Sequence, residues 1–132
     1  MSDYLYTLEF KVRDYECDLQ GIVNNSVYQN YLEHCRHEFL LHKHLDFAAL
    51  AREHVNLVVT RIELDYKTPL RSGDNFWVGL NFERKGQLRV NFLQDIYRSS
   101  DQQLCLRGLA TVAAINENGK PFYPPQLDAL FE

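Results

Sequence analysis

The sequence lacks a long hydrophobic run, and no apolar stretch approaches the roughly 18–20 residues that a membrane span requires. Its N-terminal segment does not resemble a signal peptide either. Cysteine is scarce, with three residues in 132, at widely separated positions and without a CxxC pair. An odd number of isolated cysteines is typical of free thiols in a reducing compartment. These absences predict a cytoplasmic protein with no membrane span.

Positive charge is also in short supply. Fourteen Lys and Arg residues stand against eighteen Asp and Glu residues, a net charge of -4, and the resulting field repels polyanions. We therefore expect no nucleic acid partner. Apolar residues make up 45% and charged residues 24% of the chain, close to globular averages, which excludes disordered, collagen-like and coiled-coil classes. The length of 132 residues predicts one domain, spanning residues 1–132.

Motifs for several common chemistries are absent, including GxSxG, GxGxxG and the phosphate-binding GxxxxGKS/T pattern. His37 and His42 are five positions apart, whereas the HExxH motif requires four. His34 and His37 could share a helix face, but no second pair of ligands completes a site. Cys35 and Cys105 have no activating base nearby in the sequence, so we interpret them as core residues. We predict no metal site and no cysteine nucleophile.

Aromatic residues, by contrast, are abundant, with eight Tyr, eight Phe and one Trp. Each can bury roughly 150–250 Å², which provides a large core. Residues 4–13 alternate strictly between apolar and polar side chains, which predicts a half-buried strand. Residues 27–42 show helical spacing of apolar side chains, and Asn24, Asn25 or Ser26 can cap the start of this helix.

The rest of the chain is predicted to be mainly β structure. Residues 46–53 can form a short helical turn, and a docked tail is expected to follow Gly119. Four more strands are expected, at residues 55–67, 76–83, 88–97 and 104–115. The order of one strand, one long helix and four strands predicts an α+β domain in which an antiparallel sheet covers a single helix.

An acidic residue, Asp18, precedes the start of the long helix by a few positions. Free N–H groups at a helix start, together with the positive end of the helix dipole, can hold a developing oxyanion. A nearby carboxylate, ionised at neutral pH, can then attack a substrate or activate water. Gly21 suits a loop in which the backbone comes close to a ligand. Spacing alone leaves open a purely structural role, in which Asp18 stabilises the helix start and Gly21 turns the chain.

The motif Asp18-x-x-Gly21-Ile22-Val23-Asn24-Asn25-x-x-Tyr28, with Tyr31, Glu33 and Arg36 further along, resembles hotdog-fold acyl-CoA thioesterases of the 4-hydroxybenzoyl-CoA thioesterase type. The resemblance covers nearly the whole chain. It implies a five-stranded antiparallel sheet wrapped around one long central helix.

The same resemblance implies roles for individual residues. Asp18 would be the catalytic carboxylate, acting as nucleophile or general base, and the amides of Val23, Asn24 and Asn25 would polarise the thioester carbonyl. A branch of the family has histidine where Asn25 stands, so any role of a histidine there is absent from this chain. The implied reaction is hydrolysis of an acyl-CoA to a carboxylic acid and free CoA, without a cofactor. The implied assembly is a homodimer or homotetramer with active sites between protomers.

Coenzyme A carries phosphates, so the hypothesis requires local positive charge in an acidic protein. Two turns offer it, one flanked by Arg84, Lys85 and Arg89 and the other by Lys67 and Arg71, which could make charge-assisted hydrogen bonds to phosphate. The alternative is that these are ordinary solvated turns.

Two further residues have competing interpretations. Tyr28 could line the acyl pocket, or it could belong to the core stripe of the helix. Arg61 could orient the substrate, or it could pair with Glu63 or Asp65, and nothing local decides between these roles.

Two other functions remain as alternatives. A hotdog hydratase or dehydratase would use a histidine with an acid, but the first histidine after Asp18 is His34, well along the helix. A non-catalytic hotdog module could bind an acyl or aromatic ligand, although the complete Asp18 motif argues against it.

Overall fold

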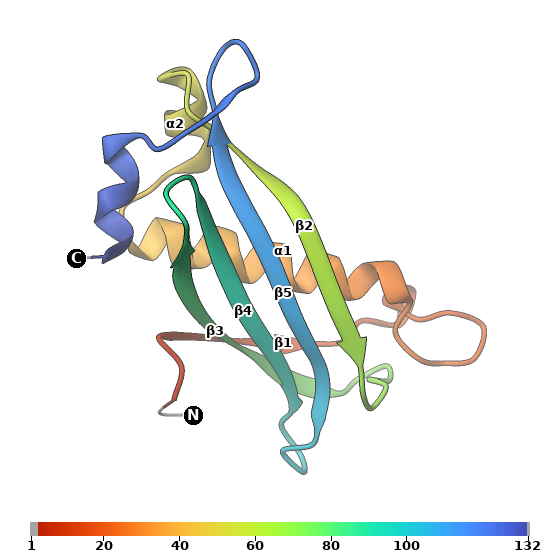
Figure 1. The fold of residues 1–132 in the computed structure, drawn as a ribbon. Coiled ribbons are helices and arrows are strands. Elements are labelled where there is room, and N and C mark those ends of the chain that lie inside the picture. Colours follow the sequence, from red (N-terminus) through yellow and green to blue (C-terminus); the bar gives the residue numbers. More distant parts are fainter. Residues whose placement is uncertain (1–2, 132) are drawn as a thin grey trace.

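The computed structural model, which describes residues 3–131, has an antiparallel sheet wrapped around one long helix (Figure 1). The elements in chain order are β1 (Tyr6–Lys11), η1 (Asp14–Glu16), α1 (Asn25–His42), α2 (Phe47–Arg52), β2 (Asn56–Tyr66), β3 (Asn75–Lys85), β4 (Arg89–Arg98), β5 (Leu104–Ile115), β6 (Pro121–Phe122) and η2 (Pro125–Phe131). The predicted hotdog arrangement is confirmed.

The sheet has the strand order β1-β3-β4-β5-β2, with β6 paired to the end of β5. The predicted count of five strands was therefore one too low. Ala114 and Ile115 of β5 pair with β2 on one side and with the two residues of β6 on the other. Strand β4 pairs with β5 only as far as Ala113 of β5. Strand β6 therefore takes the place of β4 beside the last two residues of β5.

Helix α1 begins and ends where local interactions favour it. The Asn24 side chain accepts a hydrogen bond from the Ser26 N–H at 3.1 Å, which satisfies one free donor of the first turn. At the other end, His44 adopts a left-handed backbone with φ 64°, and its N–H donates to the Leu41 carbonyl at 2.9 Å. This helix of 18 residues lies across the inner face of the sheet (Figure 1).

Close contact between helix and sheet depends on Gly108 in β5. A Cβ atom at this position would lie 2.9 Å from Leu32 Cδ1 of α1 and 3.1 Å from Leu64 Cδ2 of β2. A bulge in β2 between Val59 and Arg61 shifts the alternation of that strand. For this reason Leu57 before the bulge and Leu64 after it both pack against the core.

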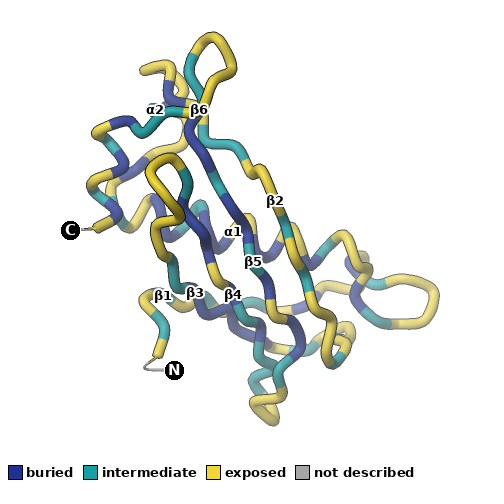
Figure 2. Tube along the Cα trace, viewed as in Figure 1, coloured by how far each residue is buried: buried dark blue, intermediate teal, exposed yellow. Residues whose placement is uncertain are grey.

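The core lies between α1 and the sheet, and its largest fully buried side chains include Phe39, Phe76 and Ile96. Figure 2 shows that β5 is largely buried, whereas the edge strand β2 is mostly exposed. None of the helices within residues 3–131 is long and apolar enough to cross a membrane. Over the same residues, no cluster of three or more His, Cys, Asp and Glu side chains could hold a metal ion.

The three cysteines are free thiols. Cys35 and Cys105 are buried, as predicted for core residues, and Cys17 is half-buried. Burial raises the pKa of all three thiols, and it raises the pKa of Cys35 to about 12.

Candidate active site

The loop between β1 and α1 extends away from the sheet (Figure 1), and Asp18 within it is exposed. Cys17 and Val23 form an antiparallel bridge across this loop, and the Asp18 N–H donates to the Ile22 carbonyl at 2.9 Å. Gly21 closes the turn with φ 78°, a left-handed conformation that favours glycine. The result is a tight turn that ends two residues before α1 begins.

Glu16 anchors this loop to the helix. Its side chain is only 9% exposed and accepts hydrogen bonds from the Tyr31 hydroxyl at 2.8 Å and from the Arg13 N–H at 2.8 Å. The Arg13 guanidinium lies 3.3 Å from the same carboxylate. Burial and the hydrogen bond to Glu16 raise the pKa of Tyr31. Glu16 was not among the predicted site residues, because its partner Tyr31 lies 15 positions later in the chain.

The segment between β2 and β3 forms the second support of the loop. The Val23 N–H donates to the Leu70 carbonyl at 2.9 Å, and Ile22 forms a bridge with Arg71. On its other side, the Leu70 N–H donates to the Tyr28 hydroxyl oxygen at 3.1 Å. The hydroxyl of Tyr28 is therefore buried and engaged in holding this segment, and burial raises its pKa.

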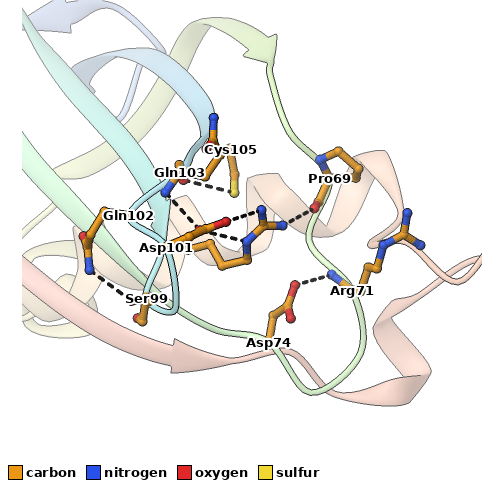
Figure 3. A network of polar contacts seen from close by, with 9 residues as sticks. Pro69, Arg71, Asp74, Ser99, Asp101, Gln102, Gln103 and Cys105 are labelled. Atoms are coloured by element: carbon orange, nitrogen blue, oxygen red, sulfur yellow. Dashed lines mark hydrogen bonds and ion pairs between the residues drawn. The ribbon is translucent and has the colours of Figure 1, made fainter.

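A network of polar contacts also holds the segment between β2 and β3 (Figure 3). The guanidinium of Arg98 pairs with both carboxylate oxygens of Asp101, at 3.0 and 2.7 Å, and donates to the Pro69 carbonyl at 3.4 Å. The Asp74 side chain accepts from the Arg71 N–H at 2.9 Å. Figure 3 shows the Arg71 side chain pointing away from Asp74, so its guanidinium remains at the exposed surface beside the loop.

The three amides at the helix start are not equivalent. The Val23 N–H is bonded to Leu70, and the Asn24 N–H donates to the Glu16 carbonyl at 3.0 Å. The expectation that these two amides polarise a substrate carbonyl is therefore corrected, because each already has an acceptor. The Asn25 N–H has no acceptor within the part of the chain that the structure describes. It lies at the first position of α1, where the helix dipole favours negative charge.

A small pocket of about 190 Å³ opens beside Asn25. Four predicted residues line it, namely Val23, Asn25, Tyr28 and Lys67, together with Tyr66, which was not predicted. The Tyr66 hydroxyl donates to the Asn25 carbonyl at 3.3 Å. The other lining residues are Ile22, Thr68, Pro69 and Cys105. The pocket therefore has room for a small ligand group beside Asn25, at the start of α1.

The basic hairpin predicted to hold phosphate lies elsewhere within this chain. Strand β3 has 11 residues, so Lys85 lies roughly 30 Å along the sheet from the end near the Asp18 loop. Arg84 and Arg89 belong to the same far end, and the Arg84 guanidinium packs over the Tyr123 ring at 3.9 Å from its centre. The structure therefore separates Arg84, Lys85 and Arg89 from Asp18.

Arg61 is also outside the site. Its Nε lies 3.2 Å from Glu63 Oε2 in an exposed pair. Of the two roles considered for Arg61, the structure shows the ion pair with Glu63, and Arg61 does not line the pocket beside Asn25.

The chain matches the model of a known protein family. The family model of the thioesterase-like superfamily matches residues 12–130. The chain therefore belongs to the thioesterase-like superfamily. The finer 4-hydroxybenzoyl-CoA type stays a prediction.

Curated relatives carry related names. The acyl-acyl carrier protein thioesterase ATL3, chloroplastic, of Arabidopsis thaliana is 34% identical over 125 residues, which are 95% of this chain and 65% of the relative. ATL2 from the same plant is 32% identical over 91% of this chain and 64% of its own length. The chain thus spans slightly less than two thirds of these two proteins. A putative esterase of Aquifex aeolicus is 30% identical, over 83% of this chain and 84% of the relative.

Solved structures agree on the fold. A 1,4-dihydroxy-2-naphthoyl-CoA thioesterase from Synechocystis superposes with a TM-score of 0.90 at 20% identity, covering 96% of each chain. A hypothetical protein from Aquifex aeolicus superposes with a TM-score of 0.87 at 28% identity, covering 95% of this chain and 98% of the other.

Proposed function

We propose that this chain hydrolyses acyl thioesters, with Asp18 as the catalytic carboxylate and the Asn25 amide as the donor to the thioester oxygen. The observation that carries the proposal is the unpaired N–H at the start of α1, which follows directly on a braced loop that carries the exposed carboxylate of Asp18. Membership of the thioesterase-like superfamily and the names of the relatives support it.

The chemistry requires only these two groups and water. Asp18 either attacks the carbonyl carbon to form a mixed anhydride or removes a proton from an attacking water molecule. The Asn25 N–H stabilises negative charge on the carbonyl oxygen as it develops. In both routes the C–S bond breaks, the sulfur leaves as a thiol after gaining a proton, and water supplies the new oxygen of the carboxylic acid.

For the substrate we propose an acyl-CoA, with the acyl end in the pocket beside Asn25. The exposed Arg71 lies next to the Asp18 loop, so it can bind a CoA phosphate, and the exposed Lys67 at the pocket adds positive charge that attracts the anionic CoA. The names of the Arabidopsis relatives make an acyl group on an acyl carrier protein the second substrate to test.

We also propose that the functional unit is a homodimer or homotetramer. Strand β2 pairs with β5 alone among residues 3–131, which leaves its outer edge free. Val59 is 45% exposed and Tyr66 48% exposed along this strand. Because free strand edges favour pairing with another chain, we expect a second copy to pair along β2 and to bring its surface next to the pocket at Tyr66. Light scattering after size-exclusion chromatography tests this assembly, and a monomeric wild type at micromolar concentration would contradict it.

The activity is tested by following release of free thiol from aliphatic and aromatic acyl-CoAs and from an acyl-carrier protein. We expect Asp18→Asn to lower kcat by about 10²–10⁴-fold with an unchanged melting temperature. Asp46→Asn is the matched control, because it removes one carboxylate, retains an amide that can cap α2 and should leave hydrolysis intact. Full activity of folded Asp18→Asn, or no hydrolysis of any thioester by the wild type, would refute the proposal. Hydration of an enoyl-CoA, or ligand binding without turnover, would instead support the alternative functions.

A further inference from the structure

A second, larger cavity lies at the opposite end of the helix from Asp18. It has a volume of about 390 Å³ and is bounded by the C-terminal half of α1, α2, the start of β2, β4, the end of β5 and η2. The helices α2 and η2 lie near the end of α1 that is away from the Asp18 loop (Figure 1). Its wall is mainly aliphatic, with Leu40, Leu57, Val90, Val112 and Leu127 among the lining residues. It shares no lining residue with the pocket beside Asn25.

Two charged side chains of α1, Glu33 and Arg36, interrupt this apolar wall together with His37. Arg36 lines the cavity and is only 7% exposed. Its Nη1 donates to Gln94 Oε1 at 3.0 Å, while Gln94 Nε2 donates to the Leu32 carbonyl at 2.9 Å. Across residues 3–131, no acidic oxygen lies within 4.0 Å of the guanidinium, and its Nε and Nη2 have no hydrogen-bond acceptor.

A buried cation without an acid in direct contact is costly, because it has lost water and gained no ion pair. Burial lowers the pKa of Arg36, and the charge of Glu33 offsets only part of this shift. The nearest acid along the helix, Glu33, is directed instead towards His37, with 4.0 Å between Glu33 Oε2 and His37 Nε2 at the exposed rim. The remaining donors of Arg36 therefore suit a planar anion that binds through two oxygens.

We propose that this cavity binds a medium-chain carboxylate, whose charged group pairs with Arg36 while its hydrocarbon chain contacts the surrounding Leu and Val side chains. At about 30 Å³ for each water-sized group, the volume of about 390 Å³ accommodates about a dozen non-hydrogen atoms. Decanoate has this size. Carboxylic acids are also the products of thioester hydrolysis, but this site depends only on the cavity and Arg36 and not on the proposed activity.

Binding is measured by calorimetry with decanoate below its micelle concentration and with decanol as an uncharged ligand of similar length. No thioester is present, so the outcome does not depend on whether the chain is a hydrolase. The wild type should bind decanoate more tightly than decanol. Arg36→Gln should weaken decanoate binding by about ten- to a hundredfold, the range for charge-assisted hydrogen bonds, and should leave decanol binding unchanged. Arg52→Gln, at an exposed arginine of the nearby α2, is the matched control and should bind like the wild type.

A second variant covers the case in which Arg36→Gln does not fold. Val112→Phe places a ring in the cavity without touching the charge, and it should weaken decanoate and decanol binding alike. The carboxyl carbon of ¹³C-labelled decanoate should also shift in the NMR spectrum of the wild-type complex. Absence of decanoate binding, equal affinity for decanoate and decanol, or undiminished binding in Val112→Phe would overturn the proposal.

Discussion

The hydrogen bond between Tyr31 and Glu16 gives the sharpest test of how the Asp18 loop is held. Tyr31→Phe removes a hydroxyl that donates to a buried carboxylate at 2.8 Å. Hydrogen bonds to charged groups contribute about 1.5–3 kcal/mol. Because Glu16 keeps its contacts with Arg13, we expect the lower half of this range, a loss of about 1.5–2 kcal/mol in the free energy of unfolding.

Urea denaturation at pH 7 measures this loss as a lower midpoint at unchanged slope. Tyr15→Phe is the control, because Tyr15 is 73% exposed and should lose less than about 0.5 kcal/mol. We also expect thioester hydrolysis to fall in Tyr31→Phe at temperatures where it remains folded, because the loop loses its anchor to α1. Equal stability and equal kcat in Tyr31→Phe and Tyr15→Phe would show that this contact does not hold the loop.

The same hydroxyl predicts a pH dependence. An unfolded tyrosine loses its proton near pH 10, whereas burial and Glu16 raise the pKa of Tyr31 in the folded chain. Above about pH 10 the folded state therefore binds more protons than the unfolded state, and stability falls as pH rises. Tyr31→Phe should make this alkaline decline shallower, which denaturation at several pH values between 9 and 11 would detect. An identical decline in both proteins would contradict this assignment.

Three other predictions concern packing and capping. Gly108→Ala places a methyl group 2.9 Å from Leu32 Cδ1 and should cost about 1–3 kcal/mol of stability, seen as a lower melting temperature; an unchanged value would show that α1 can move away from the sheet. Asn24→Ala removes the cap of α1 and should cost about 1 kcal/mol, whereas Asn24→Ser should restore most of it. The ring of Tyr97 stacks on Trp77 at 4.7 Å, so Tyr97→Ala should shift the emission of this single tryptophan to longer wavelength, and unchanged emission would contradict that stacking.

Local patterns were sufficient to predict most of the fold. The spacing along residues 27–42 identified α1, and the Asn24 cap depends only on neighbours in the sequence. The two-residue strand β6 was missed because it is too short to show alternation. The bulge between Val59 and Arg61 was missed because the side chains on either side continue a plausible alternating pattern.

The candidate site was predictable only in part, because its geometry depends on distant residues. The motif located Asp18, but it did not show that the Val23 N–H donates to the carbonyl of Leu70, which lies 47 positions later in the chain. Likewise, Tyr31 bonds Glu16 across 15 positions. Lys85 lies far from the loop because β3 is 11 residues long. Positions in the sequence alone do not show this distance.

The state of the cysteines has a practical consequence for chemical labelling. All three thiols have raised pKa values, so little of the reactive thiolate is present at neutral pH. Cys35 and Cys105 are also buried, which leaves Cys17 as the accessible position. Ellman's reagent, which detects free thiols, should therefore react slowly with the folded protein and give a low background in assays of CoA release. A dye that does attach at Cys17 would report directly on the loop that carries Asp18.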